Sequence, residues 1–592
     1  MKTAGARLPE IGLLLAGSLC LLPFLMPHHE LPVKTFHAEW LAAVLGISAA
    51  LAALIGRSAP LVSWPVPARW LVAFALFLAL LAAFGGPAYL QLPLLAALYV
   101  LWAALMLWLG AQLTSAFGTE RVATVLAAFL LAGALLTALI GVIQFHGRPK
   151  FLENFVFEFY GNRAYGNIAQ ANLYANYLAV GESALLYLWL RARVPTAYAL
   201  PALMLLVLGS ALAGSRSTLL YALWFAVLGS LPKGGGADSR RLKLAVYSLA
   251  GVTLVANVAI PWLNNLFHVG PLSHGALDRA LVSSDETAEP RPLAWLLALR
   301  LFAGAPVAGV GIGEFAGAAF DLGLDPVLVQ HAELWTSPHN LPLHLLAETG
   351  IVGAVLALGS VTAWGWQVAR RFRTEGQLAV WWIVAAVGVE MIHSLIEFPL
   401  WYMPYLGVTA LLMGVGAAPG TRFSEMSRAS RTAATAACAA LAVASIVMLG
   451  NYLKLHAAYV TGTTVTLTRA ADAQRDAATM RELTHGLMAP VAELWIVLGA
   501  PLDRDNLAVK VAMSGRVARF WPIYSVLARH AVFLAFEGET RKAQDLLASS
   551  LRTFPHRRDS IVAILQLAQA ADPGAIEPLL RAAASAPDKV SN

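Results

Sequence analysis

The sequence predicts an all-α protein that crosses a membrane many times. Of its 592 residues, 58% are hydrophobic and only 13% are charged, whereas soluble domains carry about 25% charged residues. The mean hydropathy is +0.66, and apolar runs of the roughly 20 residues that a membrane-spanning helix needs recur along the chain. These observations exclude an ordinary soluble domain and predict a polytopic membrane protein.

Apolar stretches long enough to span a bilayer occur about thirteen times. The first follows Lys2 and Arg7 and has no small-residue cleavage site, so we expect an uncleaved first span rather than a removed signal peptide. The stretches lie near residues 8–27, 38–56, 69–85, 91–113, 122–145, 167–190, 196–213, 216–232, 242–262, 341–368, 377–395, 401–418 and 432–450.

Basic residues predict the orientation of these spans. Lys and Arg favour cytoplasmic turns, and with a cytoplasmic N-terminus every inside turn carries at least one of them. Opposite turns such as FGGPAYLQ (84–91) carry none. This orientation places the long loop 263–340 and the tail outside. We expect two parts, a transmembrane body (1–450) and a C-terminal domain (451–592). It also explains the net charge of +7 without a nucleic-acid partner, because no basic run has interleaved aromatic residues.

The tail has a different composition from the body. In SVLARHAVFLAFEGETRKAQDLLASSLRTFP (525–555), apolar residues recur at helical spacing on both sides of Gly538, and Pro555 ends the second helix. This helix–turn–helix unit is TPR-like, although a stable repeat array needs about three such units. We therefore expect a helical C-terminal domain, for which simple helical hairpins are the plainer interpretation.

Polar residues at the outer ends of spans are candidates for a site, because they are costly at membrane depth. The run GNRAYGNIAQANLYANYL contains Arg163, Gln170 and Asn172, and helix capping explains it as readily as ligand binding. AGSRST (213–218) places Arg216 in a turn. An arginine there can either snorkel to the interface or bind phosphate oxygens with its fork of donors.

A further candidate segment lies within the long outer loop. Arg291 and Trp295 begin an expected amphipathic helix that stops at Pro306. The following GVGIGEF (309–315) is similar to a glycine-rich nucleotide loop. It lacks the Lys-Ser/Thr ending and the preceding strand of such a loop, so we reject a nucleotide site.

The stretch TSPHNLPLHLLAETGIVG (336–353) joins a polar turn to an apolar helix. Ser337 and Asn340 are typical of a helix start, which puts His339 at a helix N-terminus, where an anionic group is favoured, and Glu348 inside the span.

Another outer helix end, EMIHSLIEFPLW (390–401), carries His393 and Glu397 one turn apart. A zinc site is disfavoured, because the possible ligands form no compact pair on one helix face. These possible ligands are His331, Glu333, His339 and His344.

Three motifs carry a resemblance to a known family. SPHNLPLHLLAETGIVG resembles the signature of the O-antigen ligase/polymerase superfamily, whose members have a long periplasmic loop before such a helix. GNRAYGNIAQANLYANYL and HSLIEFPLWYMPYLG are similar to motifs of the bacterial protein O-oligosaccharyltransferases (PglL type). The resemblance covers roughly residues 120–420, and the tail contains no motif that matches.

The resemblance implies a GT-C-like glycosyltransferase of a Gram-negative inner membrane. Its partners would be an undecaprenyl-pyrophosphate-linked glycan, membrane lipids and an acceptor protein, possibly pilin-like, whose Ser or Thr hydroxyl is modified with inversion and without metal or other cofactor. Arg216 and Arg291, with Arg163 as a weaker candidate, would neutralise the pyrophosphate, and His339 would act as general base. The supporting residues would be Gln170, Asn172, Asn340, Glu348, His393 and Glu397.

Two other functions remain open. An O-antigen ligase acting on lipid A core, or an O-antigen polymerase, would keep Arg216, Arg291 and His339 but use a sugar hydroxyl as acceptor. A transporter of a lipid-linked glycan would use the arginines only to guide an anion. Transporters often have inverted repeats with broken helices, and we find no such repeat in the sequence, so an enzyme is favoured.

Overall fold

The computed structural model describes residues 4–56, 60–230, 237–272, 274–276, 291–323, 334–374, 378–417, 425–464 and 482–585. Within these ranges the chain forms helices and no β-strand, apart from one isolated bridge between Val62 and Glu425. The predicted fold class, an all-α polytopic membrane protein, is confirmed.

Each stretch expected to span the membrane contains a helix. Over the described part of the chain, nine helices are long and apolar enough to cross a bilayer, while α8, α15 and α16 are apolar but shorter. Helix α6 has 20 residues but is not among the nine. The number of spans therefore stays a prediction. The helices are α1 (Ala4–Leu19), α2 (Phe36–Ile55), α3 (Val66–Phe84), α4 (Gln91–Phe117), α5 (Thr119–His146), α6 (Ala171–Leu190), α7 (Thr196–Ala213), α8 (Ser217–Ser230), α9 (Ala237–Phe267), α14 (Leu341–Thr374), α15 (Leu378–His393), α16 (Met403–Ala417) and α17 (Arg428–Thr464).

The chain forms two compact units, each built from segments that are distant in sequence. The first unit comprises Met1–Ala73, Tyr99–Ser284 and Ala357–Ile446, and the second comprises Phe74–Leu98, Asp285–Leu356 and Val447–Asn592. In the first unit, α6 packs against α5, α7 and α15 and is buried on almost all sides. The polar residues at its N-terminus are therefore held by neighbouring helices.

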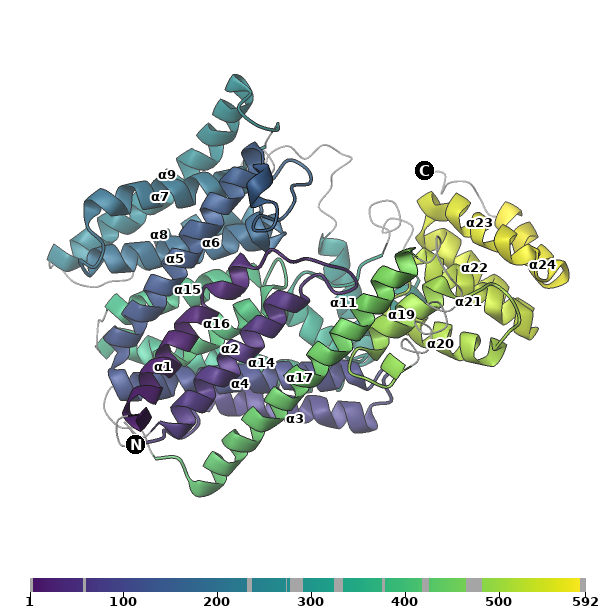
Figure 1. Cartoon of the computed structure of the whole chain (residues 1–592), viewed down its shortest axis with the longest axis horizontal. Helices are drawn as coiled ribbons and strands as arrows, with labels where there is room; N and C mark the ends of the chain where they lie inside the picture. The colour runs from purple at the N-terminus through teal and green to yellow at the C-terminus, as the bar shows by residue number, and fades with distance from the viewer. Residues whose placement is uncertain are drawn as a thin grey trace. The chain divides into compact units, whose positions relative to one another are not determined.

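The C-terminal part of the second unit consists of short helices joined by tight turns (Figure 1). Gly538, with φ 97°, separates two of them, and the next helix ends before Pro555, as the sequence predicts. The TPR-like classification stays a prediction. The helices are α19 (Ala489–Gly499), α20 (Leu507–Phe520), α21 (Tyr524–Glu537), α22 (Thr540–Thr553), α23 (Arg558–Gln569) and α24 (Pro573–Ser585).

Two further helices of the second unit come from the long loop. They are α11 (Arg291–Gly304) and α12 (Phe315–Asp321). The expectation that the first is amphipathic is wrong: Leu297 and Leu301 are buried, but Leu296 and Leu299 on the opposite side are 44% and 46% exposed. Apolar side chains on both sides suit a helix with apolar surroundings on both sides.

Helix α14 is interrupted at Gly350, which has φ 62° and ψ −167°. The preceding carbonyls and following N–H groups lose their helical partners at such a break. Segment 306–311 replaces these partners. The pairs are Val310 N to Ala347 O (2.9 Å), Gly311 N to Glu348 O (3.1 Å), Ile351 N to Pro306 O (2.8 Å) and Val352 N to Val307 O (3.4 Å).

Gly350→Ala should lower the thermal unfolding midpoint of the detergent-solubilised protein by several degrees. A Cβ at this position would lie 2.3 Å from the carbonyl carbon of Val307, and the backbone conformation alone costs a non-glycine residue about 1–3 kcal/mol. Gly365→Ala is the matched control in α14, because a Cβ there meets no described atom within 4 Å. Equal midpoints for the two variants would contradict this account of the break.

The C-terminal helices should lose stability between pH 6.5 and 4. Burial lowers the pKa of His530 to about 4, while an unfolded histidine titrates near 6.5. Between these two pKa values the unfolded chain binds a proton at His530 that the folded chain does not bind. The free energy of unfolding is therefore highest above pH 6.5 and falls by about 2–3 kcal/mol towards pH 4. His530→Gln should flatten the pH dependence of the unfolding midpoint. Parallel curves for wild type and variant would rule out this histidine as the cause.

Candidate functional site

The turn before α14 is held by its own hydrogen bonds. Asn340 Oδ1 accepts a hydrogen bond from Leu343 N at 3.1 Å, which caps the helix. His339 has φ 49°, a left-handed conformation that non-glycine residues adopt rarely. Its N–H donates to Ser337 Oγ at 3.2 Å. The predicted position of His339 at a helix N-terminus is confirmed.

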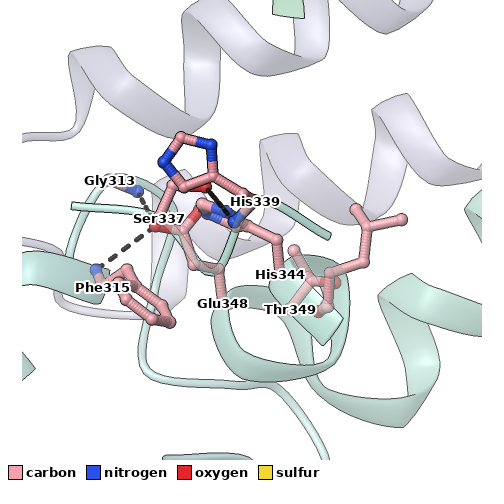
Figure 2. Close-up of polar contacts among 8 residues, drawn as sticks. Gly313, Phe315, Ser337, His339, His344, Glu348 and Thr349 are labelled. Atoms are coloured by element: carbon pink, nitrogen blue, oxygen red, sulfur yellow. Dashed lines mark hydrogen bonds and ion pairs between the residues drawn. The ribbon is translucent and has the colours of Figure 1, made fainter. Parts of the chain in front are cut away.

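A chain of polar contacts continues from this turn into α14 (Figure 2). Ser337 Oγ lies 3.1 Å from His344 Nδ1, and His344 Nε2 lies 3.0 Å from Glu348 Oε2. All three side chains are buried. Ser337 Oγ accepts a hydrogen bond from His339 N, and its hydrogen bond with His344 Nδ1 takes its direction from the tautomer of the ring. His344 Nε2 and Glu348 Oε2 lie within ion-pair distance. Polar contacts thus lead from the backbone of His339 to the carboxylate of Glu348.

The glycine-rich loop 309–315 surrounds the carboxylate at the other end of this chain. Glu348 Oε1 accepts hydrogen bonds from Gly313 N at 3.0 Å and from Phe315 N at 3.2 Å. Gly309, with φ 73°, approaches α14 so closely that a Cβ there would lie 2.2 Å from the Glu348 carbonyl carbon. These donors, which a nucleotide phosphate would need, are therefore used by Glu348.

Helix α11 also contacts the His339 turn. Trp295 Nε1 donates to Pro338 O at 3.0 Å. Arg291 precedes Trp295 by four residues and so lies on the same face of α11. The His339 ring contacts Trp335 edge to face, with centroids 5.6 Å apart. Two of the predicted residues, Arg291 and His339, are thereby brought to one region of the second unit.

The predicted residues other than Arg291, His339, Asn340 and Glu348 lie in the first unit, where Asn172 connects three segments. Arg163 donates from Nε to Ala213 O at 2.7 Å and from Nη2 to Asn172 Oδ1 at 2.7 Å. Ser215 Oγ donates to the same oxygen at 3.0 Å, and Asn172 Nδ2 donates to Glu397 Oε1 at 3.1 Å. The loop before α6, the turn before α8 and the segment after α15 are thus tied together.

The remaining candidate residues of the first unit are Arg216, His393 and Gln170. Arg216 lies directly before α8. His393, the last residue of α15, is buried and its Nδ1 is hydrogen-bonded to the Tyr221 hydroxyl. Gln170 accepts from Leu173 N at 2.5 Å and caps α6. For Gln170, the structure shows the expected helix-capping contact, and its supporting role stays a prediction.

Several residues of the two polar clusters, the one around His339 and the one around Asn172, were not predicted from the sequence. Ser337 was assigned only to the helix start, and His344 was considered only as a zinc ligand. Ser215 and Tyr221 were not singled out. The spacing of His344 and Glu348, four residues apart on one helix face, was the signal that could have identified their pair.

Two of the four possible zinc ligands, His331 and Glu333, lie outside the described residues. Among the residues that are described, no three His, Cys, Asp or Glu side chains lie close enough to hold a metal ion. His344 contacts Ser337 and Glu348 instead.

Comparison with known proteins identifies relatives along most of the chain. Residues 201–358, which include Arg216, Arg291 and His339, match the family model described as "O-Antigen ligase". Residues 381–568 match the model described as "Virulence factor membrane-bound polymerase, C-terminal".

One curated relative is similar over much of its length. The chain is 27% identical over 408 residues to the "General O-oligosaccharyltransferase" of Acinetobacter baylyi (strain ATCC 33305 / BD413 / ADP1), covering 68% of this chain and 69% of the relative. These matches, on an all-helical membrane fold with the signature turn in place, confirm the resemblance. The chain is a membrane enzyme of the glycosyltransferase type, and over residues 201–358 it is similar to the O-antigen ligases.

Proposed function

We propose that this enzyme transfers an oligosaccharide from an undecaprenyl-pyrophosphate carrier to the Ser or Thr hydroxyl of periplasmic proteins, pilin-type proteins included. The observation that carries the proposal is the turn at His339, a histidine at a helix N-terminus whose backbone is fixed through Ser337, His344 and Glu348. A protein acceptor is supported by the name of the relative.

His339 is the general base of this reaction. The acceptor hydroxyl is weakly acidic, so its oxygen attacks the anomeric carbon efficiently only if a base removes the proton as the bond forms. The bond between the anomeric carbon and the pyrophosphate oxygen breaks, and a single displacement inverts the anomeric configuration. A ring on a rigid turn loses little conformational freedom when the acceptor binds, which lowers the barrier.

Arg216 and Arg291 bind the pyrophosphate and neutralise the charge that develops as it leaves. The guanidinium is always charged and its donors fit phosphate oxygens, so this stabilisation needs no metal. Arg163 is the weaker candidate, because its Nε and Nη2 already donate to Ala213 O and Asn172 Oδ1. Its contribution is to hold the turn that carries Arg216.

The same proposal includes a location. The basic turns favour a cytoplasmic N-terminus, so the site faces the periplasm from a Gram-negative inner membrane. The transmembrane body is then residues 1–450, with loop 263–340 on the periplasmic side, and residues 451–592 form a periplasmic helical domain.

A second candidate function is ligation of the glycan to a lipid A core. It is favoured by the match of residues 201–358 to the O-antigen ligase family. The mechanism is the same, with a sugar hydroxyl in place of the Ser or Thr hydroxyl, so an experiment must offer both acceptors together.

Replacing the base should abolish most of the transfer. In proteoliposomes with a lipid-linked glycan, a Ser-containing pilin-like protein and a lipid A core, we expect only the protein to gain mass. His339→Ala should slow this gain about 10²–10⁴-fold, while His146→Ala, which removes an exposed histidine at the end of α5, should have no effect. Modification of the lipid would establish the second candidate, and normal transfer by His339→Ala would exclude the general-base role.

Ser337→Ala should slow transfer about tenfold, because it deprives His339 N and His344 Nδ1 of their shared partner, a loss of about 1–3 kcal/mol. We expect kcat to fall and KM for the lipid-linked glycan to stay nearly constant. Ser360→Ala is the control, since Ser360 is also buried in α14 and its hydroxyl contacts no hydrogen-bond partner in the described part of the chain. Equal rates for the two variants would show that the turn does not depend on this chain of contacts.

A further inference from the structure

We infer that the C-terminal helices position the His339 turn through an ion pair between Arg519 and Glu314. Both are positioning residues for the transfer reaction, acting through the backbone of loop 309–315. The inference rests on the proposed role of His339, and all the contacts that support it lie within the second unit.

The first step is the ion pair itself. Arg519, near the end of α20, donates from Nη2 to Glu314 Oε2 at 2.6 Å. The other carboxylate oxygen, Oε1, accepts from Ala88 N at 2.6 Å. The Glu314 residue is only 7% exposed, so loss of the arginine would leave a buried charge without its cation. The carboxylate therefore depends on α20 for its position.

The second step connects Glu314 to Glu348. Glu314 is the residue between Gly313 and Phe315, whose N–H groups both donate to Glu348 Oε1. Two N–H groups that converge on one oxygen require the intervening backbone to keep its conformation. A shift of Glu314 therefore weakens the contacts that hold Glu348, and through His344 and Ser337 it reaches the backbone of His339.

The third step is the close packing between α12 and α20. A Cβ on Gly317 would lie 2.1 Å from Arg519 O, so the backbones of the two helices are nearly in contact. Phe320, one turn further along α12, packs in a hydrophobic cluster with Leu527 and Phe554. The helix that starts directly after Glu314 thus follows any movement of α20 and α21.

A neighbouring contact holds the segment that supplies Ala88. Tyr89 Oη donates to Glu493 Oε2 at 2.6 Å, and Arg516 Nη2 donates to Glu493 Oε1 at 2.6 Å. Segment 85–90 is therefore fixed to α19 and α20, as Glu314 is fixed to α20. Ala88, one partner of the Glu314 carboxylate, is thus held by α19 and α20, and the other partner, Arg519, belongs to α20.

The first test is kinetic and uses the full-length enzyme. Arg519→Met should lower kcat about tenfold, the effect of about 1.4 kcal/mol, with KM for the lipid-linked glycan unchanged within about twofold. Arg519→Lys, which keeps the charge, should retain most of the rate. Arg504→Met is the matched control, because Arg504 is similarly exposed and forms an ion pair with Asp572 at 2.5 Å in the same helical domain.

A double mutant distinguishes coupling between Arg519 and Glu314 from a general loss of stability. Glu314→Gln keeps an acceptor for Ala88 N but removes the charge that Arg519 binds. If the two residues act as a pair, Arg519→Met combined with Glu314→Gln should be no slower than the slower single variant. Additive losses, or a kcat for Arg519→Met no lower than that of Arg504→Met, would overturn the inference.

A second test does not depend on the chemistry. Hydrogen–deuterium exchange of the intact protein in micelles should be faster in Arg519→Met at peptides covering 306–315 and 336–345, and unchanged there in Arg504→Met. Unchanged exchange in Arg519→Met would overturn the inference, as would faster exchange with a normal kcat. Failure of the proposed function is distinguishable, because it would appear as normal transfer by His339→Ala whatever the exchange result.

Discussion

A buried carboxylate inside an apolar helix is the constraint on which the candidate site depends. Glu348 lies in α14 with 5% of its surface exposed, and such a group is tolerated only when its oxygens are hydrogen-bonded or paired. One oxygen accepts hydrogen bonds from Gly313 N and Phe315 N, and the other lies 3.0 Å from His344 Nε2, within ion-pair distance. The requirement therefore fixes a loop on one side and an imidazole on the other, and the imidazole in turn fixes Ser337 and the His339 backbone.

The interruption of α14 and this carboxylate form one arrangement. Breaking the helix at Gly350 exposes main-chain groups on both sides of the break, and segment 306–311 satisfies them by running alongside residues 347–352. The same loop continues into the residues that hold Glu348. A glycine is needed on each side, at Gly309 and Gly350, because a Cβ at either position would meet the opposing backbone. The loop is therefore placed by the helix break and then positions the carboxylate.

Features encoded by neighbouring residues could be predicted from the sequence, and features made by distant contacts could not. Apolar runs located the helices, and Asn340, Gly538 and Pro555 marked helix ends through local backbone chemistry. The loop 309–315 could only be excluded as a nucleotide site, because its partner Glu348 lies more than thirty residues away. The expected amphipathic character of α11 was wrong, since a mixture of arginine and leucine does not reveal that leucines face outward on both sides.

The two clusters share a principle of construction. Ser337 fixes the backbone of His339, and Ser215, held by Asn172, fixes the turn that carries Arg216. In both cases hydrogen bonds of neighbouring side chains orient the backbone from which a candidate reactive side chain projects. A transfer reaction gains from such placement, because rigid support lowers the conformational entropy lost on reaching the reactive geometry. Each serine is thus a supporting residue of its own cluster, beside the histidine in the second unit and beside the arginine in the first.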